Sequence, residues 1–343
     1  MSVPECRVDQ CIDIAVPGWG PRLACPTNVQ VRCGTNVAGR GILNRVVIGL
    51  ILAATLLSRG HAENIKVLNP DAHYPEGPVW YHGKLYYIEY DRNTITVWDG
   101  RENTVFASDP GCGPSAVIAT AAGEFLTTCY DNGSIGRTTA DGKSLPRYTQ
   151  DKDGHKFIAP NDFAPDAHGG IYFSDSGHDG KLSDAKVFYI SARGSITLEA
   201  DKLRSANGLA VSKDGKILYV IETDDSRLLR FAIGRDGSLS DRRVFVDLND
   251  LTNHVVQLFP DGMKIDSKGQ IYIGQSPRDV HAPLTGKIFV IDSDAKLIRT
   301  LTLPSVQVPN LAFSPDEKTL YVTAVDQIDK VPHAGKVYSI PNN

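Results

Sequence analysis

Residues 258–274 read LFPDGMKIDSKGQIYIG, and this stretch decides the fold. It holds two runs in which apolar and polar residues alternate, MKID and QIYIG, with a Ser-Lys-Gly turn between them. Alternation with period two is typical of a strand with one buried face, and Gly among polar residues is typical of a tight turn. The stretch therefore predicts two antiparallel strands, with the carboxylate of Asp261 at the start of the first.

The same pattern recurs along the chain. Five further copies begin at Glu76 (EGPVWYHGKLYYIE), Pro114 (PSAVIATAAGEFLTTC), Asn161 (NDFAPDAHGGIYFSD), Asn207 (NGLAVSKDGKILYV) and Pro309 (PNLAFSPDEKTLYVTA). With Asp261, the six first positions are spaced 38, 47, 46, 54 and 48 residues apart. Further strand-like runs follow each copy, so one unit of about 45 residues holds four short strands, as a propeller blade does. We predict an all-β fold, a six-bladed β-propeller with four-stranded blades.

The two ends of the repeat predict how the propeller closes. The last unit shows only three strand-like runs before Asn343, and the run NIKVL (residues 64–68) lies just ahead of the first unit. We expect this N-terminal strand to complete the last blade, because the pairing would leave no free sheet edge.

Composition and charge narrow the range of partners. The chain has 343 residues, 41% hydrophobic and 22% charged, which suits a large globular domain. Its formal net charge is −4 and it has no Lys/Arg-rich block, so we expect no nucleic-acid partner. A small-molecule substrate is favoured, and the sequence gives no indication of the oligomeric state.

The N-terminal region reads as a leader. Arg40 and Arg45 precede the apolar run VVIGLILAATLL (residues 46–57), and SRGHA follows with small residues where signal peptidase cleaves. We predict a signal peptide over residues 37–62, cleaved after Ala62, and a periplasmic or secreted protein. The alternative is a membrane anchor, but twelve apolar residues fall short of the roughly 20 that span a bilayer. Residues 1–36 are expected to be an extension outside the native protein, and residues 63–343 form the propeller domain.

The repeat also predicts a metal site. The first strand of a blade lies innermost, so the residues that open the six copies should meet at the central axis. Four of these six residues carry oxygen ligands: Glu76, Asn161, Asn207 and Asp261. Carboxylate and amide oxygens without His or Cys favour a hard cation, Ca²⁺ first and Mg²⁺ or Mn²⁺ next. Side-chain turns are the alternative for any one of them, but four in register favour one divalent metal ion.

A second tier of residues is expected on the same face. The second strand of each copy returns to that face, and its last residue is Glu89, Asp175 or Glu222 in three copies. We predict that these residues, with Asn161, contact substrate or orient metal ligands, although solvated loop residues are the alternative. Cys112 and Cys129 fall on this face of the second blade and are expected to form a disulfide in an oxidising compartment. Two buried thiols are the alternative.

The sequence resembles the SMP-30, gluconolactonase and lactonohydrolase-like (SGL) family. The resemblance rests on EGPVW at residues 76–80, PND at 160–162, NGLAVSKDGKILYV at 207–220 and PDGMKID at 260–266. It implies a six-bladed propeller with one divalent metal, usually Ca²⁺ or Zn²⁺, held by Glu76, Asn207 and Asp261, with Asn161 on the metal or the substrate. The implied activity is hydrolysis of sugar lactones such as gluconolactone. Ala159 stands where the SMP-30 branch has Arg, so the gluconolactonase branch fits better.

These observations predict a metal-dependent lactone hydrolase. The metal is expected to polarise the lactone carbonyl, with Asp261 as general base toward water or as nucleophile. Some relatives of the SGL family hydrolyse organophosphates, so a phosphotriesterase on the same site is one alternative. A propeller that binds a partner without catalysis is the other. No G-x-S-x-G nucleophile elbow is found.

Overall fold

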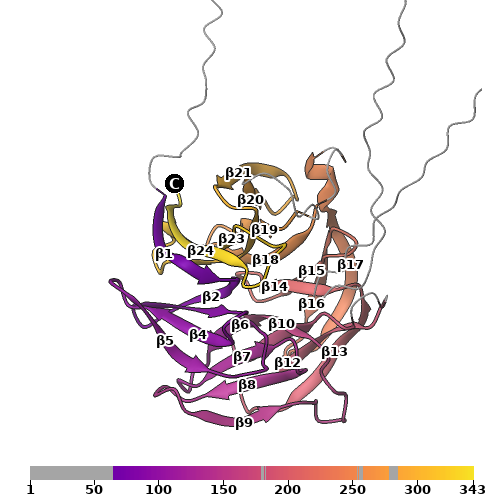
Figure 1. Ribbon diagram of the computed structural model, residues 1–343. Helices are drawn as coiled ribbons and strands as arrows, with labels where there is room; N and C mark the ends of the chain where they lie inside the picture. The colour runs from indigo at the N-terminus through magenta and orange to yellow at the C-terminus, as the bar shows by residue number, and fades with distance from the viewer. Residues whose placement is uncertain (1–64, 179–180, 182, 253, 255–257, 278–284) are drawn as a thin grey trace, which may run out of the picture. The chain divides into compact units, whose positions relative to one another are not determined.

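The computed structural model describes residues 65–178, 181, 183–252, 254, 258–277 and 285–343. They belong to the compact unit Asn64–Asn343, which is a propeller of six four-stranded antiparallel sheets (Figure 1). The predicted all-β fold, with six four-stranded blades, is therefore confirmed. The expected extension (1–36) and signal peptide (37–62) lie outside the described residues.

Blades 1 to 5 each use four strands that follow one another in the chain. Blade 1 contains β2 (Pro75–Tyr81), β3 (Lys84–Glu89), β4 (Thr94–Trp98) and β5 (Asn103–Ser108). Blade 2 contains β6 (Pro114–Ala119), β7 (Phe125–Cys129), β8 (Ser134–Thr138) and β9 (Ser144–Tyr148). Blade 3 contains β10 (Pro160–Pro165), β11 (Ile171–Asp175), β12 (Ala185–Ile190) and β13 (Ile196–Leu203).

Blades 4 and 5 follow the same plan, and blade 6 takes its fourth strand from the N-terminal end of the unit. Blade 4 contains β14 (Ala206–Val211), β15 (Ile217–Glu222), β16 (Arg227–Ile233) and β17 (Leu239–Asp247), which the short 3-10 helix η2 (Leu248–Thr252) follows. Blade 5 contains β18 (Pro260–Ile265), β19 (Ile271–Gln275), β20 (Gly286–Ile291) and β21 (Leu297–Leu303). Blade 6 contains β22 (Gln307–Phe313), β23 (Thr319–Val325), β24 (Ala334–Pro341) and the N-terminal β1 (Lys66–His73).

The N-terminal strand closes the propeller, as predicted. β1 pairs antiparallel with β24, from Lys66 opposite Ser339 to His73 opposite Ala334. Figure 1 shows the two strands side by side, β1 in indigo and β24 in yellow. The sheet order is therefore β1-β24-β23-β22, so blade 6 joins both ends of the unit.

The inner strands pack closely around the axis. A Cβ atom on Gly77 would lie 2.3 Å from the Cα of Ala116, and one on Gly208 would lie 2.5 Å from the backbone oxygen of Asp261. Neither position has room for a side chain, since such distances lie far inside van der Waals contact. Glycine therefore lets the backbone of one inner strand touch the next, which holds the residues beside it near the axis.

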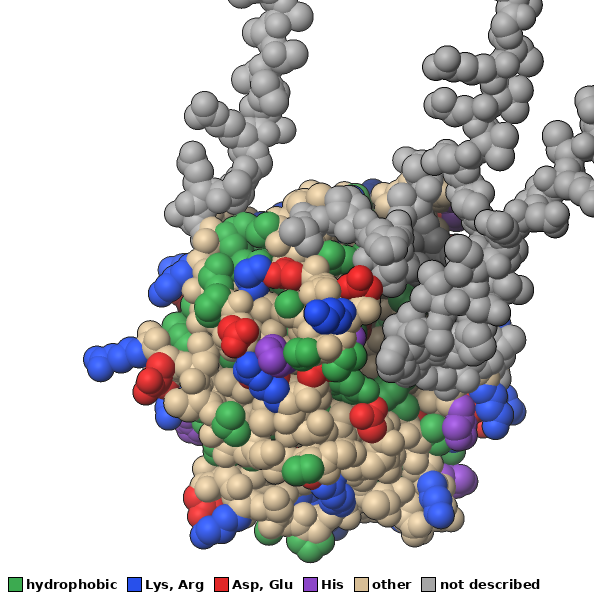
Figure 2. All heavy atoms as spheres, in the orientation of Figure 1, with side chains coloured by type: hydrophobic (Ala, Val, Ile, Leu, Met, Phe, Trp, Pro, Cys, Tyr) green, Lys and Arg blue, Asp and Glu red, His purple; other side chains and the backbone are tan. Residues whose placement is uncertain are grey.

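Charged side chains of both signs are mixed on the surface. On the described part of the face in Figure 2, Lys and Arg side chains are interspersed with Asp and Glu, without a large basic patch. No helix among the described residues is long and apolar enough to cross a membrane.

Candidate metal centre

Strand register places one residue of each blade at the same level of the axis. In five blades the inner strand begins with Pro75, Pro114, Pro160, Ala206 or Pro260, each paired with the last residue of the second strand. The residues that follow are Glu76, Ser115, Asn161, Asn207 and Asp261. Blade 6 is aligned on a pair further along the strand, because Leu311 pairs with Val322 as Leu209 pairs with Val220 in blade 4. Pro309 lies two residues before Leu311, as Asn207 lies two residues before Leu209, so Pro309 takes this level. We call these six residues the ring.

One member of the ring differs from the sequence prediction. The prediction placed Pro114 at this level, whereas the register gives Ser115, because Pro114 pairs with Cys129 as Pro160 pairs with Asp175. The register keeps Glu76, Asn161, Asn207 and Asp261 at the level the sequence predicted.

Three of the predicted ligands lie close together. The side chain of Asn207 donates a hydrogen bond to the carboxylate of Asp261, and the charge of Asp261 raises the pKa of Glu76. Ser276 Oγ, just after β19, donates a second hydrogen bond to Asp261 Oδ2 at 3.0 Å. Asn161 is 8% exposed, and its backbone oxygen accepts a hydrogen bond from Thr128 Oγ1 at 2.7 Å, which ties its strand to blade 2.

Two oxygen atoms of the ring are buried without a hydrogen-bond partner. They are Glu76 Oε2 and Asn207 Oδ1. A buried polar atom without a partner costs about 1–3 kcal/mol, so such atoms need a specific explanation. Asp261 and Asn207 keep part of their accessible surface, which means that the ring can be reached from solvent.

The charges in this region are not balanced by protein groups alone. Burial, opposed by hydrogen bonds from Ser276 and Asn207 and aided by the charge of Asp162, raises the pKa of Asp261 to about 7. Burial and the charges of Asp261 and Asp162 hold the pKa of Glu76 well above its usual range. Carboxyl groups with raised pKa values in one buried site are typical of sites that bind cations or protons.

A further polar group lies one residue deeper along the inner strands. Asp162 in blade 3 and Asn310 in blade 6 are buried and meet across the axis, with Asn310 Nδ2 3.2 Å from Asp162 Oδ2. Lys264 Nζ lies 3.3 Å from the same oxygen. The corresponding residues of the other four blades are small: Gly77, Ala116, Gly208 and Gly262. They leave the space that the two larger side chains fill.

The donor set fits a hard divalent cation. The carboxylates of Glu76, Asp162 and Asp261 with the ammonium of Lys264 sum to two negative charges. The two oxygen atoms without partners belong to a carboxylate and an amide, the ligand types that Ca²⁺ prefers. Glu76, Asn161, Asn207 and Asp261 are thus the residues that could hold the ion.

The family model for the SMP-30/Gluconolactonase/LRE-like region matches residues 74–326, which include all six ring residues. The chain belongs to this family. The resemblance that the four sequence motifs indicated is thereby confirmed.

Individual proteins are similar to this chain at low identity. The Bacillus subtilis protein named "Putative sugar lactone lactonase YvrE" is 24% identical over 277 residues, which cover 77% of this chain and 89% of YvrE. A gluconolactonase structure from Xanthomonas campestris has a TM-score of 0.64 at 23% identity and covers 81% of this chain and 89% of its own. The calcium-binding protein regucalcin from Agrobacterium tumefaciens gives 0.67 at 19% identity, covering 80% and 92%. At identities this low, the similarity to the two solved structures establishes the fold alone.

The second tier has a structural role in this family member. The carboxylate of Asp175 accepts backbone N–H groups of Ile158 at 2.7 Å, Ala159 at 2.9 Å and Gly177 at 3.0 Å. Two of these residues directly precede the inner strand β10. Glu89 accepts the N–H of His73 before β2, and Glu222 accepts the N–H of Arg204 before β14, both at 2.9 Å.

Each of these three carboxylates is therefore a loop clamp, a side chain that accepts N–H groups of the loop entering an inner strand. That they also contact substrate or orient metal ligands stays a prediction. Their side chains are at most 2% exposed, and arginines complete two of the sets: Arg92 on Glu89, and Arg227 and Arg242 on Glu222. Gln275 does the same in blade 5, where its Oε1 accepts the N–H of Phe259 at 3.1 Å. A carboxylate with its oxygens held in this way has little capacity left for a ligand.

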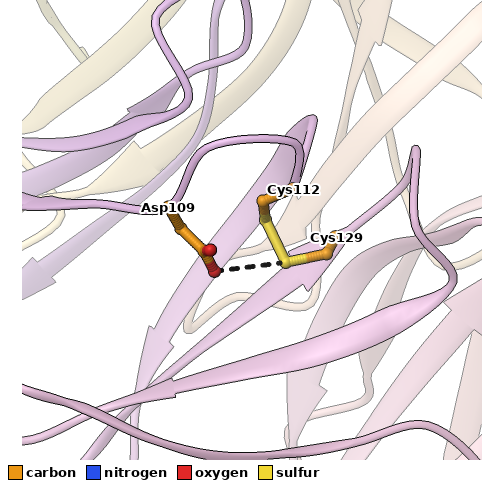
Figure 3. Close-up of side chains that lie close together, drawn as sticks. All are labelled: Asp109, Cys112 and Cys129. Carbon is orange, nitrogen blue, oxygen red and sulfur yellow. Dashed lines mark hydrogen bonds between the residues drawn. A yellow bond between two sulfur atoms is a disulfide. The ribbon is translucent and has the colours of Figure 1, made fainter.

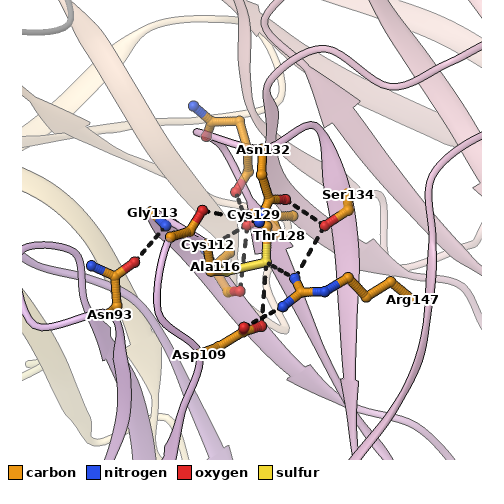
Figure 4. The surroundings of a disulfide bond; sticks show 12 residues. Asn93, Asp109, Cys112, Gly113, Ala116, Thr128, Cys129, Asn132, Ser134 and Arg147 are labelled. Carbon is orange, nitrogen blue, oxygen red and sulfur yellow. Dashed lines mark hydrogen bonds and ion pairs between the residues drawn. A yellow bond between two sulfur atoms is a disulfide. The ribbon is translucent and has the colours of Figure 1, made fainter.

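In blade 2 a disulfide takes the place of the clamp. Cys129 ends β7 and is bonded to Cys112, which lies two residues before the inner strand β6 (Figure 3). The guanidinium of Arg147 reaches Cys129 Sγ at 3.3 Å, Ser134 Oγ at 3.2 Å and the carboxylate of Asp109 (Figure 4). Asp109 and the two cysteines are grouped as metal ligands would be, but bonded sulfurs are not thiolates, so this cluster is no metal site.

Several residues of the site were not predicted from the sequence. Asp162, Lys264, Asn310 and Ser276 are not at the strand position that the repeat singled out. One signal was available: the residue after the ring position is Gly or Ala in four blades, and Asp162 and Asn310 break that pattern. Nothing in the sequence pattern shows that Lys264 reaches the axis.

Proposed function

We propose that this protein is a divalent-metal-dependent hydrolase of sugar lactones. Membership of the SGL family supports a lactonase-like function, as do its similarities to YvrE and to the gluconolactonase of Xanthomonas campestris. The observation that carries the metal dependence is the pair of buried oxygens, Glu76 Oε2 and Asn207 Oδ1, that lack partners beside Asp261. Regucalcin, a calcium-binding protein of the same fold, makes Ca²⁺ the first choice of ion.

The proposed chemistry divides between the ion and the chain. When bound, the ion supplies the polarisation of the lactone carbonyl. Asp261 takes the proton from the attacking water, or attacks the carbonyl carbon itself, and the hydrogen bonds from Asn207 and Ser276 fix its orientation. Asn161 lies at the same level of the axis and is the proposed contact for the substrate or the ion.

Replacing Asp261 tests this proposal. Asp261→Asn removes the basic oxygen and nearly preserves the shape of the side chain, so we expect lactone hydrolysis to fall at least about 10³-fold. Hydrolysis of aldonolactones and of a phosphotriester is measured with and without chelator. The matched control is Asp294→Asn, an exposed residue between β20 and β21 of the same blade.

Each outcome decides between the candidate functions. Activity that survives in Asp261→Asn contradicts the role of this residue, and activity that chelator leaves unchanged contradicts the metal. Turnover of the phosphotriester alone favours an organophosphate hydrolase, and no turnover by wild type favours a binding module. As a nucleophile, Asp261 opens the lactone to a mixed anhydride, which water then hydrolyses. In a single turnover in H₂¹⁸O, label in the Asp261 carboxylate identifies the nucleophile, because it arises only when water attacks Cγ of that anhydride.

We also propose that the protein is exported. The proposal rests on the leader-like residues 37–62, and the Cys112–Cys129 disulfide supports it, since such bonds persist in oxidising compartments. Expression from the native gene with separation of cell compartments tests it. The expected result is a periplasmic or secreted product that begins at Glu63, and a cytosolic product that keeps residues 37–62 contradicts it.

A further inference from the structure

Lys264 places a positive charge among the carboxylates of the axis. It lies on β18, three residues after Asp261, and its Nζ is 3.3 Å from Asp162 Oδ2 and 3.2 Å from Asn310 Oδ1. The Lys264 side chain is 25% exposed and that of Asp162 is 4% exposed. In the described part of the chain, Lys264 is the one cationic side chain that forms an ion pair with Glu76, Asp162 or Asp261.

Asn310 connects this ammonium group to the ring. Its Oδ1 accepts hydrogen bonds from Lys264 Nζ and from the N–H of Leu311 at 2.9 Å. Its Nδ2 donates to Asp162 Oδ2 at 3.2 Å and to Glu76 Oε1 at 3.3 Å. All four bonding positions of the amide are used, so its orientation is fixed. One oxygen of Glu76 is thereby engaged and the other, Oε2, is left for another ligand.

The charge count gives this arrangement a consequence for metal binding. Three carboxylates close together would hold three negative charges, and a divalent ion offsets only two of them. The third charge would be buried and unpaired, which costs several kcal/mol or forces a proton onto one of the groups. Lys264 removes that third charge without a second ion.

We propose that Lys264 is a positioning residue that sets the charge of the metal centre: its ammonium group cancels one axial carboxylate, so that the centre binds one divalent ion with moderate affinity. The proposal rests on the proposed function, because it assumes that Glu76, Asn207 and Asp261 bind the ion. A purely structural ion pair between Lys264 and Asp162 would affect folding stability alone. A charge-setting lysine also changes the affinity for the ion, because charges act over several ångströms in a partly buried site.

A charge cycle tests the proposal. Ca²⁺ affinity is measured by calorimetry at pH 8 on metal-stripped wild type, Lys264→Met, Asp162→Asn, the double variant and Lys264→Arg. We expect Lys264→Met to bind about tenfold more tightly and Asp162→Asn about tenfold more weakly, since each changes the charge near the ion by one unit. The double variant restores the net charge and should return to within about threefold of wild type, as should Lys264→Arg.

Controls separate this result from other failures. Lys268→Met makes the same chemical change at an exposed residue of the same blade and should leave the affinity unchanged. An unchanged or weaker affinity in a folded Lys264→Met overturns the proposal. If Lys264→Met does not fold, Asp162→Asn decides. A Ca²⁺ affinity of Asp162→Asn equal to that of wild type overturns the proposal, and so does a double variant that binds no more tightly than Asp162→Asn. Wild type that binds no divalent ion would instead overturn the proposed function.

Discussion

At the scale of single residues, the environment of Asp261 determines what the site can bind. Burial and the charge of Asp162 raise the pKa of Asp261 to about 7. The donors Asn207 and Ser276 act in the opposite direction but do not outweigh burial. In the proposed metal centre, protons and a divalent ion would therefore compete for the same carboxylate.

Ca²⁺ binding should weaken as the pH falls through 7. The ion binds the ionised form of Asp261, and a group with a pKa of about 7 is about 90% ionised at pH 8 and about 10% at pH 6. We expect the apparent affinity at pH 6 to be about tenfold or more below that at pH 8. Calorimetry across this range measures it, and proton release in buffers of different ionisation enthalpy gives the number of protons displaced. An affinity that is flat between pH 6 and 8 would contradict the raised pKa.

The metal-free protein should show the opposite linkage in its stability. A carboxyl group whose pKa is higher in the folded state stabilises the fold below the ordinary pKa of Asp and loses that contribution as the pH rises through about 7. The unfolding midpoint in chelator should therefore drop between pH 5 and pH 8 more in wild type than in Asp261→Asn. Equal pH dependence in the two proteins would contradict this expectation.

At the scale of the strands, the clamps position the ring. Each one joins the end of the second strand to the loop that enters the inner strand, so the backbone that carries the ring residue is held on both sides. Hydroxyl groups add a link between blades: Ser176 Oγ donates to the Ala206 oxygen and Thr223 Oγ1 to the Pro260 oxygen, both at 2.8 Å. The ring residues are thus rigidly presented, as a preformed metal site requires.

Removing the clamp of blade 3 should cost stability and also disturb the ring. Asp175→Ala leaves the N–H groups of Ile158, Ala159 and Gly177 without their acceptor, which should lower the free energy of unfolding by about 3 kcal/mol. Denaturant unfolding measures the loss. Asp153→Ala is the matched control, because its exposed pair with Lys152 should contribute less than about 1 kcal/mol. Similar losses in the two variants would show that Asp175 is no clamp.

The sequence could predict the residues that open each copy of the repeat, but not the contacts between side chains of different blades. The repeat predicts the level of Glu76, Asn161, Asn207 and Asp261, because each of them opens a copy of the same two-strand unit. In blade 2 the same alignment predicts Pro114, whereas the register gives Ser115, because Pro114 takes the position that Pro160 has in blade 3. Contacts between side chains of different blades, such as Lys264 with Asp162, depend on blade rotation and side-chain length, which no sequence period encodes.

At the scale of the whole molecule, β1 joins the two ends of the propeller in one sheet. β1 buries Ala72 and Leu68 and covers the edge of β24. Without it the edge of β24 would present unpaired backbone groups to solvent, and such edges pair with other chains.

A chain that lacks β1 should therefore be less stable and prone to association. We expect a protein that begins at Tyr74 to unfold at a clearly lower temperature than one that begins at Glu63, and to elute as larger species in size-exclusion chromatography. The protein that begins at Glu63 is the control, because it keeps all of β1. Equal unfolding temperatures and equal elution volumes would show that β24 does not need its partner.

The pairing of Lys66 with Ser339 also orders events during synthesis. β1 leaves the ribosome before the strands of blades 1 to 5, and its partner β24 leaves after them. These five blades can therefore assemble while β1 is still unpaired. Pairing at such a separation in the chain is slow, and an unpaired early strand is exposed in the meantime. A nascent chain that stops before Ala334 lacks β24, so β1 has no partner and blade 6 stays open.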